Sequence, residues 1–454
     1  MGRSSTRRRA GARLLVTLVV AASTAAACVG GGGTPSPAPA DVTPAPANGL
    51  TVAPSAVGGL APGVGQLSPG MAGDAGTGAP DWVRPGIRLT WYGAAASVAQ
   101  AYYTYVEDEN GTWEDPATGK RYRRTDESGE EMPTAAGEAY TETDVIAVEG
   151  NEVVLVNTMY SIDLLARQLV LNPLGGGRSP GALVDGAWVH PALLQSVAAN
   201  GYDGYQILRG SYLFGDTTYD AISFVSTGET AYQASTFDAA SGVLLRTNTS
   251  TQGAGSPVHG PLDDPQGNVQ LSNTRLVGAR QRNLPGMTAP VPWWVAPGGQ
   301  LAYGGSYTAS NPLDQASGPW VFPMEVTVTF QDVGGTWATF ASHSVTDLGG
   351  SPQESDGTSA TGPTGLYWYD PASLAAMAPG DVLDEDPVTS ARISVESAGP
   401  GAGGGSAVTI LTEANGVSIR TSYDVASGIL VSLELVQSVT GGTVSLQLTS
   451  GIPG

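Results

Sequence analysis

Few residues in this sequence have the types and spacing that catalysis requires. The chain of 454 residues contains three histidines, His190, His259 and His343, and none lies at metal-ligand spacing from another. Ser306 follows two glycines, but the stretch lacks the glycine that closes a nucleophile elbow. Carboxylates are so numerous that a pair suited to glycoside hydrolysis carries little information. The sequence therefore offers no catalytic residue and favours a non-catalytic protein.

A metal site has more support, from acidic residues gathered in one turn-like stretch. These residues are Asp381, Asp384, Glu385 and Asp386. Ca²⁺ prefers clustered carboxylate and carbonyl oxygens, although the spacing here is not that of an EF-hand loop. The same composition is typical of a solvated acidic loop. Calcium is the only cofactor that the sequence suggests.

Aromatic residues suggest a second kind of site. The chain has nine tryptophans and seventeen tyrosines. Tryptophans that recur in a repeat are expected in the core. The aromatics without a counterpart are Tyr102, Tyr103, Tyr105 and Trp113. Because flat aromatic rings stack on sugars, we take these four as candidate ligand-binding residues for a glycan.

The elements that must position these residues occur twice. Three stretches recur in the same order: 82–86 with 294–298 at an offset of 212, 188–194 with 368–374 at an offset of 180, and 237–244 with 423–430 at an offset of 186. One match could arise by chance, but three in register indicate an internal duplication.

Each repeated stretch predicts a local structure. The Asp-x-Ala-Ser-Gly pattern between apolar runs predicts a tight hairpin turn, in which Asp accepts backbone hydrogen bonds and Gly adopts a positive φ. His190 and Asp370 stand where a helix N-cap would be, each followed by a proline at the first helical position. The Pro-Gly pairs near the start of each copy predict turns that lead into strands.

We therefore predict a mainly β fold of two homologous antiparallel β units, each with one short helix, behind a disordered N-terminal tether. The predicted boundaries are 1–27 for a signal peptide, 28–80 for the tether, 81–251 for the first unit, 252–292 for a linker and 293–454 for the second unit. The two units could be separate sandwich-like domains or one pseudo-twofold fold. The first unit carries extra residues at about 100–143, rich in charge and in turn signals such as Asn110-Gly111, which predict a protruding hairpin.

The N-terminus predicts export. Residues 1–13 contain five arginines, the apolar run 14–27 is too short to span a bilayer, and the only cysteine, Cys28, follows Ala25-Ala26-Ala27. This pattern resembles the lipobox of bacterial lipoproteins, although Ala25 stands where that class usually has leucine. The resemblance implies lipidation of Cys28 and anchoring to the outer face of the cytoplasmic membrane. Ordinary cleavage after an Ala-x-Ala sequence, which would leave a secreted protein, is the alternative.

Composition supports an external location. Residues 29–80 are mostly glycine, proline, alanine, serine and threonine, and they offer too little apolar surface to fold. Formal net charge is −21, and removal of the signal arginines leaves 15 basic against 41 acidic residues, or −26. Nucleic-acid binding requires the opposite sign and is excluded.

Three function classes follow. The first is an envelope lipoprotein that binds a partner protein or a wall polymer without catalysis. The second is a carrier or sensor for a lipid or another small hydrophobic ligand, which rests on architecture alone. The third is a carbohydrate-active protein.

Overall fold

The computed structural model describes part of the chain. The described residues are 78–97, 106–107, 112–114, 121–123, 135–163, 168–184, 186–202, 204–214, 217–227, 231–252, 269–309, 319–346, 352–362, 364–401, 405–439 and 441–451. The predicted signal peptide, Cys28 and nearly all of the predicted tether lie outside these residues. Within them, no helix is both long enough and apolar enough to cross a membrane.

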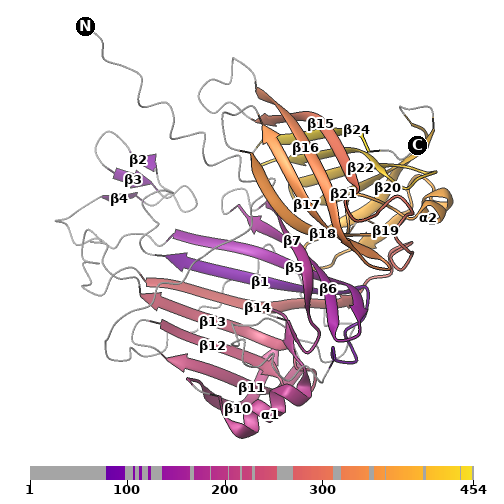
Figure 1. Ribbon diagram of the computed structural model, residues 1–454. Coiled ribbons are helices and arrows are strands. Elements are labelled where there is room, and N and C mark those ends of the chain that lie inside the picture. Colours follow the sequence, from indigo (N-terminus) through magenta and orange to yellow (C-terminus); the bar gives the residue numbers. More distant parts are fainter. Residues whose placement is uncertain are drawn as a thin grey trace.

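The first unit forms a nine-stranded antiparallel sheet (Figure 1). Its strands are β1 (Ile87–Ser97), β5 (Ala135–Glu149), β6 (Glu152–Ile162), β7 (Leu169–Pro180), β10 (Gln206–Phe214), β11 (Thr217–Thr227), β12 (Ala231–Asp238), β13 (Leu244–Gln252) and β14 (Val269–Gln281). Their spatial order is β10-β11-β12-β13-β14-β1-β5-β6-β7. The opening strand β1 therefore lies inside the sheet, between the closing strand β14 and the second long strand β5.

The second unit repeats this arrangement in a ten-stranded sheet. Its strands are β15 (Gln300–Ala309), β16 (Trp320–Val333), β17 (Trp337–Thr346), β18 (Gln353–Ala360), β19 (Val382–Glu385), β20 (Arg392–Pro400), β21 (Ser406–Ala414), β22 (Val417–Asp424), β23 (Leu430–Gln437) and β24 (Gly442–Ser450). The order is β18-β17-β16-β15-β24-β23-β22-β21-β20-β19. The opening strand β15 again lies between the closing strand β24 and β16, so the predicted mainly β fold of two similar units is confirmed.

Each unit differs from the other by one addition. The second unit has β19, which the first unit lacks among its described residues, between its helix and β20. The first unit has a longer connection between its first two long strands, 98–134, where the second unit has 310–319. Within that connection β2 (Val106–Glu107), β3 (Thr112–Glu114) and β4 (Arg121–Arg123) form a small antiparallel sheet. The predicted insertion extended to about residue 143, but β5 already begins at Ala135.

The predicted linker 252–292 is wrong in part, because it contains β14. This strand pairs with β13 on one side and with β1 on the other, so it closes the first sheet. Its sequence gives a weak apolar pattern because one face carries Arg275 and Arg280 instead of core residues. The first unit therefore extends at least to Gln281.

The short helices begin as predicted. Helix α1 (Pro191–Asn200) has His190 as its N-cap, whose Nδ1 accepts a hydrogen bond from Ala192 N at 3.2 Å. Helix α2 (Pro371–Ala376) has Asp370, whose carboxylate accepts from Ser373 N at 2.8 Å. Both helices bury a single leucine, Leu194 in α1 and Leu374 in α2.

The three repeated stretches meet at one place in each unit. In the first unit the Trp82 indole N–H donates to Ser241 O at 2.9 Å. Trp188 forms a β-bridge with Val243. Trp188 also begins β9 (Trp188–Val189), which pairs with β8 (Leu183–Val184). In the second unit Trp294 donates to Ser427 O, also at 2.9 Å, and Trp368 bridges to Ile429. The recurrence of the three stretches thus reflects a single packing motif that each copy needs.

Glycine is required inside this motif. A Cβ on Gly242 would lie 1.8 Å from Val189 O, and a Cβ on Gly428 would lie 2.1 Å from Tyr369 O. Both glycines also have positive φ, which fits the predicted turn.

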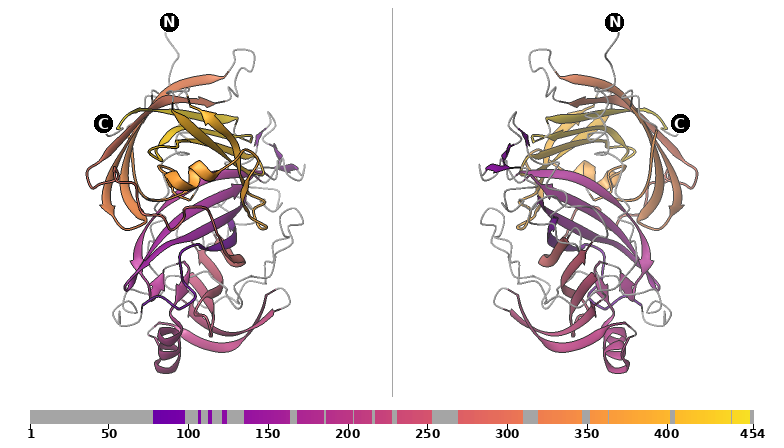
Figure 2. Two further views of the ribbon diagram at one scale, coloured as in Figure 1. Left: turned by 90° about the vertical axis from the view of Figure 1, so that its right-hand side faces the viewer. Right: turned by 90° about the vertical axis from the view of Figure 1, so that its left-hand side faces the viewer.

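The two units pack directly against each other (Figures 1 and 2). No described strand of one unit pairs with a strand of the other. However, one buried apolar cluster joins Tyr92, Tyr140 and Tyr160 of the first unit to the core of the second. The central strands of the first sheet are therefore buried on both faces, one toward the core around Trp188 and the other toward the second unit.

Candidate functional site

The residues predicted to bind ligands fall mostly outside the described structure. Cys28, Tyr102, Tyr103 and Tyr105 are not among the described residues, and Trp113 lies in β3. Lipidation and glycan binding therefore stay predictions.

The predicted calcium residues do not act as one cluster. The Asp381 carboxylate accepts from Ala378 N at 2.8 Å, and Glu385 lies 3.4 Å from exposed Arg392. Asp384 and Asp386 instead pair with arginines of the first unit. Among the described residues no group of three or more histidine, cysteine or acidic side chains is arranged to hold a metal. The structure thus gives Asp384 and Asp386 a different role from the predicted calcium site.

That role is a buried ion-pair network where the two units meet. We call it the junction network, and its members are Arg88, Glu142, Asp144, Arg280, Arg282, Asp384 and Asp386. The first five come from the first unit, and the last two come from β19 and the turn after it. Charges in such a dry location persist only when they are paired and hydrogen-bonded.

Strand register brings the first-unit members together. Arg88 on β1 lies opposite Asp144 on β5 and opposite Arg280 on β14. The Arg88 guanidinium binds the Asp144 carboxylate in a two-pronged contact, Nε to Oδ1 at 2.9 Å and Nη2 to Oδ2 at 2.6 Å. Because Thr90 and Glu142 form the next pair, Glu142 lies on the same face, and its Oε2 is 2.6 Å from Arg88 Nη1.

The second unit completes the network. Arg280 binds Asp384 through both terminal nitrogens, at 2.6 and 2.8 Å, and contacts Asp386 Oδ2 at 3.0 Å. Arg282 connects the two units, because its Nε donates to Asp384 at 2.8 Å and its Nη1 donates to Asp144 at 3.0 Å. Two backbone N–H groups, of Val388 and Thr389, hold the other oxygen of Asp386.

Glu142 is the carboxylate with the weakest compensation. Burial raises the pKa of Glu142 to about 7, and the charges of Asp386 and Asp144 add to this, although Arg88 opposes it. Burial would also raise the pKa of Asp144, but Arg88 and Arg282 outweigh it and hold that pKa well below its usual range. The network contains three arginines and four carboxylates, so one carboxylate has no guanidinium to itself. Glu142 can therefore hold a proton near neutral pH.

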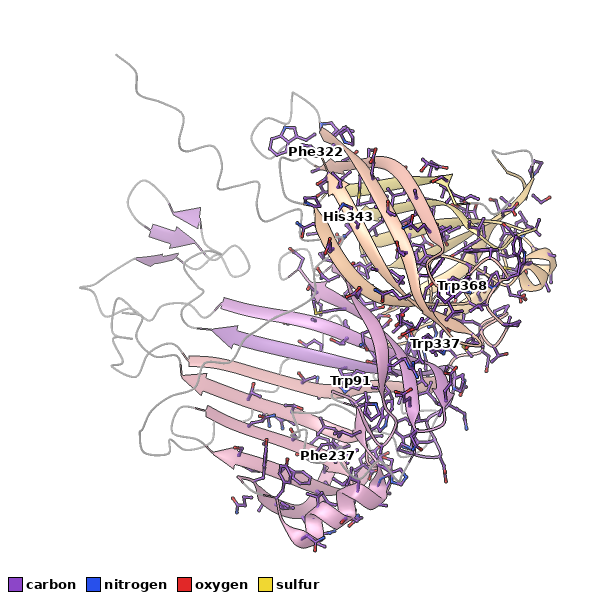
Figure 3. All side chains as sticks on the ribbon, viewed as in Figure 1. Trp91, Phe237, Phe322, Trp337, His343 and Trp368 are labelled. Carbon is purple, nitrogen blue, oxygen red and sulfur yellow. The ribbon has the colours of Figure 1, made fainter. Side chains whose placement is uncertain are left out.

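A tryptophan of the second unit also contacts the first unit. Trp337 of β17 is 2 % exposed, and its indole N–H donates to Glu149 Oε1 of the first unit at 2.8 Å. The Arg178 guanidinium lies over the Trp337 ring, 5.4 Å from its centroid. In Figure 3 Trp337 lies between the two units, apart from Trp91 and Trp368, which lie within them.

Sequence reasoning missed the junction network. Arg88 alternates with Ile87 and Leu89 at the start of a strand, a pattern that ordinarily indicates one solvent-exposed face, so the sequence gives no local signal that Arg88 is buried. Its partners from the second unit follow almost three hundred residues later, so no local pattern connects them. Two residues of the acidic stretch, Asp384 and Asp386, belong to the network, but the sequence analysis assigned the stretch to calcium and did not identify its arginine counter-charges.

The two histidines that the structure describes, His190 and His343, do not form a metal site. His190 caps α1, as expected from its match with Asp370. His343 is exposed, with its Nδ1 3.8 Å from Glu354. His259 lies outside the described residues.

Comparison with known proteins identifies no family. No protein-family model and no curated protein matches the chain. The crystal structure of MucB in complex with MucA(peri) is 11% identical, covers 79% of this chain and 87% of that chain, and has a TM-score of 0.18. The complex structure of Pseudomonas aeruginosa MucA/MucB is 11% identical, covers 80% and 89%, and has the same TM-score of 0.18. Such a low score carries no argument about this chain.

Proposed function

We propose that this protein is an exported envelope lipoprotein, anchored to the outer face of the cytoplasmic membrane through Cys28, that binds a partner protein without catalysis. The export signal and the acidic composition support the location. One observation supports partner binding: the first sheet ends in a long strand, β10, whose outer edge has no paired strand among the described residues.

The other sheet edges lack this property. β7 and β18 lie edge to edge at the junction, where a Cβ on Gly175 would be 3.0 Å from Asp356 O. β19 forms the outer edge of the second sheet and is only four residues long. Short or covered edges are the usual protection against unwanted strand pairing. β10 has nine residues, and no strand of the described residues covers its outer edge.

Because the two units are duplicates, the edge strand β10 can be compared with its equivalent in the second unit. Gln206 of β10 and Arg392 of β20 begin equivalent strands, separated by the same 186 residues as the repeated hairpin turns. In the second unit β19 covers β20. In the first unit no strand of the described residues stands at the equivalent position, and Leu208 and Leu213 on β10 are 46% and 68% exposed. An open edge with exposed apolar side chains fits the addition of an extended segment from another protein.

The experiment that tests this proposal is quantitative co-purification from cell envelopes. The full chain is compared with the double variant Leu208→Lys, Leu213→Lys. The matched control is Val382→Lys, because Val382 is 46% exposed on β19, the outer edge strand of the second sheet. We expect one protein to co-purify in a defined ratio with the wild type and the control, and to be lost from the double variant. Equal recovery with all three forms would refute binding at β10.

A further inference from the structure

The second unit shows what covers the strand equivalent to β10. There β19 lies antiparallel to β20, with Val382 directly opposite Ser394. The contact extends to the residue before β19, because Val395 N donates to Asp381 O at 2.8 Å. β19 and the residue before it therefore serve as an internal template for a segment that pairs with such an edge.

Leu208 indicates an apolar residue in the segment that β10 receives. It occupies the position that Ser394 has 186 residues later, and its side chain is 46% exposed. A segment added to β10 as β19 is added to β20 would place its equivalent of Val382 directly opposite Leu208. Residues directly opposite each other on two antiparallel strands contact each other through their side chains. An apolar residue at this position of the segment would therefore cover Leu208.

Arg209 adds a charge at the next position. It is the only charged residue of β10, and it occupies the position of Val395, so the segment's equivalent of Asp381 would lie beside it. The Arg209 side chain is exposed, and its Nη2 donates to Gln195 Oε1 at 3.0 Å. Within the described part of the chain no carboxylate forms an ion pair with Arg209. A carboxylate beside this guanidinium would accept charge-assisted hydrogen bonds.

The covered edge of the second unit uses the same kind of pairing, because Arg392 of β20 lies 3.4 Å from Glu385 of β19. We propose that the partner segment at β10 runs antiparallel to it, with an apolar residue opposite Leu208 and a carboxylate beside Arg209. This inference rests on the proposed function, since it names the chemistry of the partner at the same edge. An exposed ion pair contributes little to affinity, so the contact acts chiefly by discriminating against basic segments.

The test is binding of fluorescent peptides to the full exported chain carrying Cys28→Ser, so that no lipid anchor contributes. The first peptide has the sequence of residues 378–385 of this chain. Two further peptides differ from it only by Asp381→Asn or Asp381→Lys. The protein variant is Arg209→Glu. The control is Arg84→Gln, because Arg84 is an exposed arginine of the same unit that also bonds a glutamine side chain.

We expect the aspartate peptide to bind the wild type about threefold more tightly than the asparagine peptide, and the lysine peptide to bind most weakly. Arg209→Glu should reverse this order, and Arg84→Gln should leave it unchanged. A reversed order cannot come from loss of folding. Absence of binding by all three peptides, equal affinities for the wild type, or an order that survives Arg209→Glu would overturn the proposal.

Disulfide trapping tests the direction of the segment. Gln206 occupies the position of Arg392, which lies opposite Glu385, so the C-terminal end of an antiparallel peptide should lie beside it. We expect Gln206→Cys to form a disulfide with a peptide that carries a C-terminal cysteine, and much less with one that carries an N-terminal cysteine. Equal trapping of both peptides, or preference for the N-terminal cysteine, would contradict the antiparallel arrangement.

Failure of this inference is distinguishable from failure of the proposed function. If the co-purified protein is lost from the Leu208→Lys, Leu213→Lys variant but fully retained by Arg209→Glu, β10 binds a partner whose segment has no carboxylate at this position. Reduced recovery with Arg209→Glu and normal recovery with Arg84→Gln would support the proposal. A wild-type dimer that the double variant dissociates would place a second copy of the chain at β10 and overturn it.

Discussion

At the scale of single residues, Glu142 is the member of the junction network whose protonation changes near neutral pH. Its pKa is raised by burial to about 7, from an ordinary value of 4.5. The folded protein therefore holds a proton that the unfolded chain releases between these two values. Stability from this group is complete below about pH 4.5 and is lost as the pH rises toward 7.

Glu142→Gln tests this directly. The substitution removes the titrating group. Relative to the wild type, the free energy of unfolding of Glu142→Gln should therefore rise by roughly 3 kcal/mol between pH 4 and pH 8, which is the energy equivalent of the pKa difference. Denaturant unfolding of both forms at several pH values measures it. A difference between the two forms that does not change with pH would contradict a raised pKa.

The aspartates of the network act in the opposite direction. Arg280 and Arg282 outweigh the effect of burial and lower the pKa of Asp384 to about 2, and the pKa values of Asp144 and Asp386 are also lowered. Their contribution to stability is present above about pH 4 and is lost as the pH falls below it. The network as a whole is therefore expected to stabilise the protein most near pH 4 to 5.

Asp384→Ala separates the observed role from the predicted calcium site. The substitution takes one carboxylate from each of two arginines of the buried network, Arg280 and Arg282, so we expect a loss of about 3–5 kcal/mol in the free energy of unfolding. The loss should be the same with and without EDTA, because the counter-charges belong to the protein. If EDTA destabilises the wild type and this response disappears in the variant, calcium binds at Asp384.

At the scale of elements, the sequence predicted the structures whose signals are local. The hairpin turns, the N-caps His190 and Asp370, and the duplicated β units all follow from short patterns that the structure confirms. β14 was missed because its burial comes from packing against the second unit, which leaves polar residues such as Arg280 inside. The junction network was missed for the same reason, since its carboxylates and arginines are brought together only by tertiary structure.

The repeated packing motif makes a prediction about its glycines. Gly428 and Gly298 both have positive φ, 73° and 79°, but a Cβ would meet Tyr369 O at 2.1 Å only at Gly428. We expect Gly298→Ala to cost about 1–2 kcal/mol, from backbone conformation alone. Gly428→Ala should cost at least about 3 kcal/mol, because it also forces β-carbon and carbonyl apart. Equal losses in thermal or denaturant unfolding would show that the close contact does not matter.

At the scale of the whole molecule, the two units share part of their core and are expected to unfold together. They share an apolar cluster, and both the junction network and Trp337 connect them. We expect a single calorimetric transition for the wild type. Trp337→Ala should lower the free energy of unfolding by about 3–5 kcal/mol and separate the transition into two. Trp293→Ala is the control, because Trp293 is 75% exposed and its loss should have little effect. Two separate transitions in the wild type would contradict a shared core.

The central claim is that the open edge of the first sheet receives a partner protein. The most direct measurement is photo-crosslinking in intact cells, with a photoreactive amino acid at position 208 on β10 or at position 382 on β19. The account predicts one discrete adduct of defined mass from position 208 and none from position 382. Adducts of the same kind from both positions, or none from position 208, would contradict it.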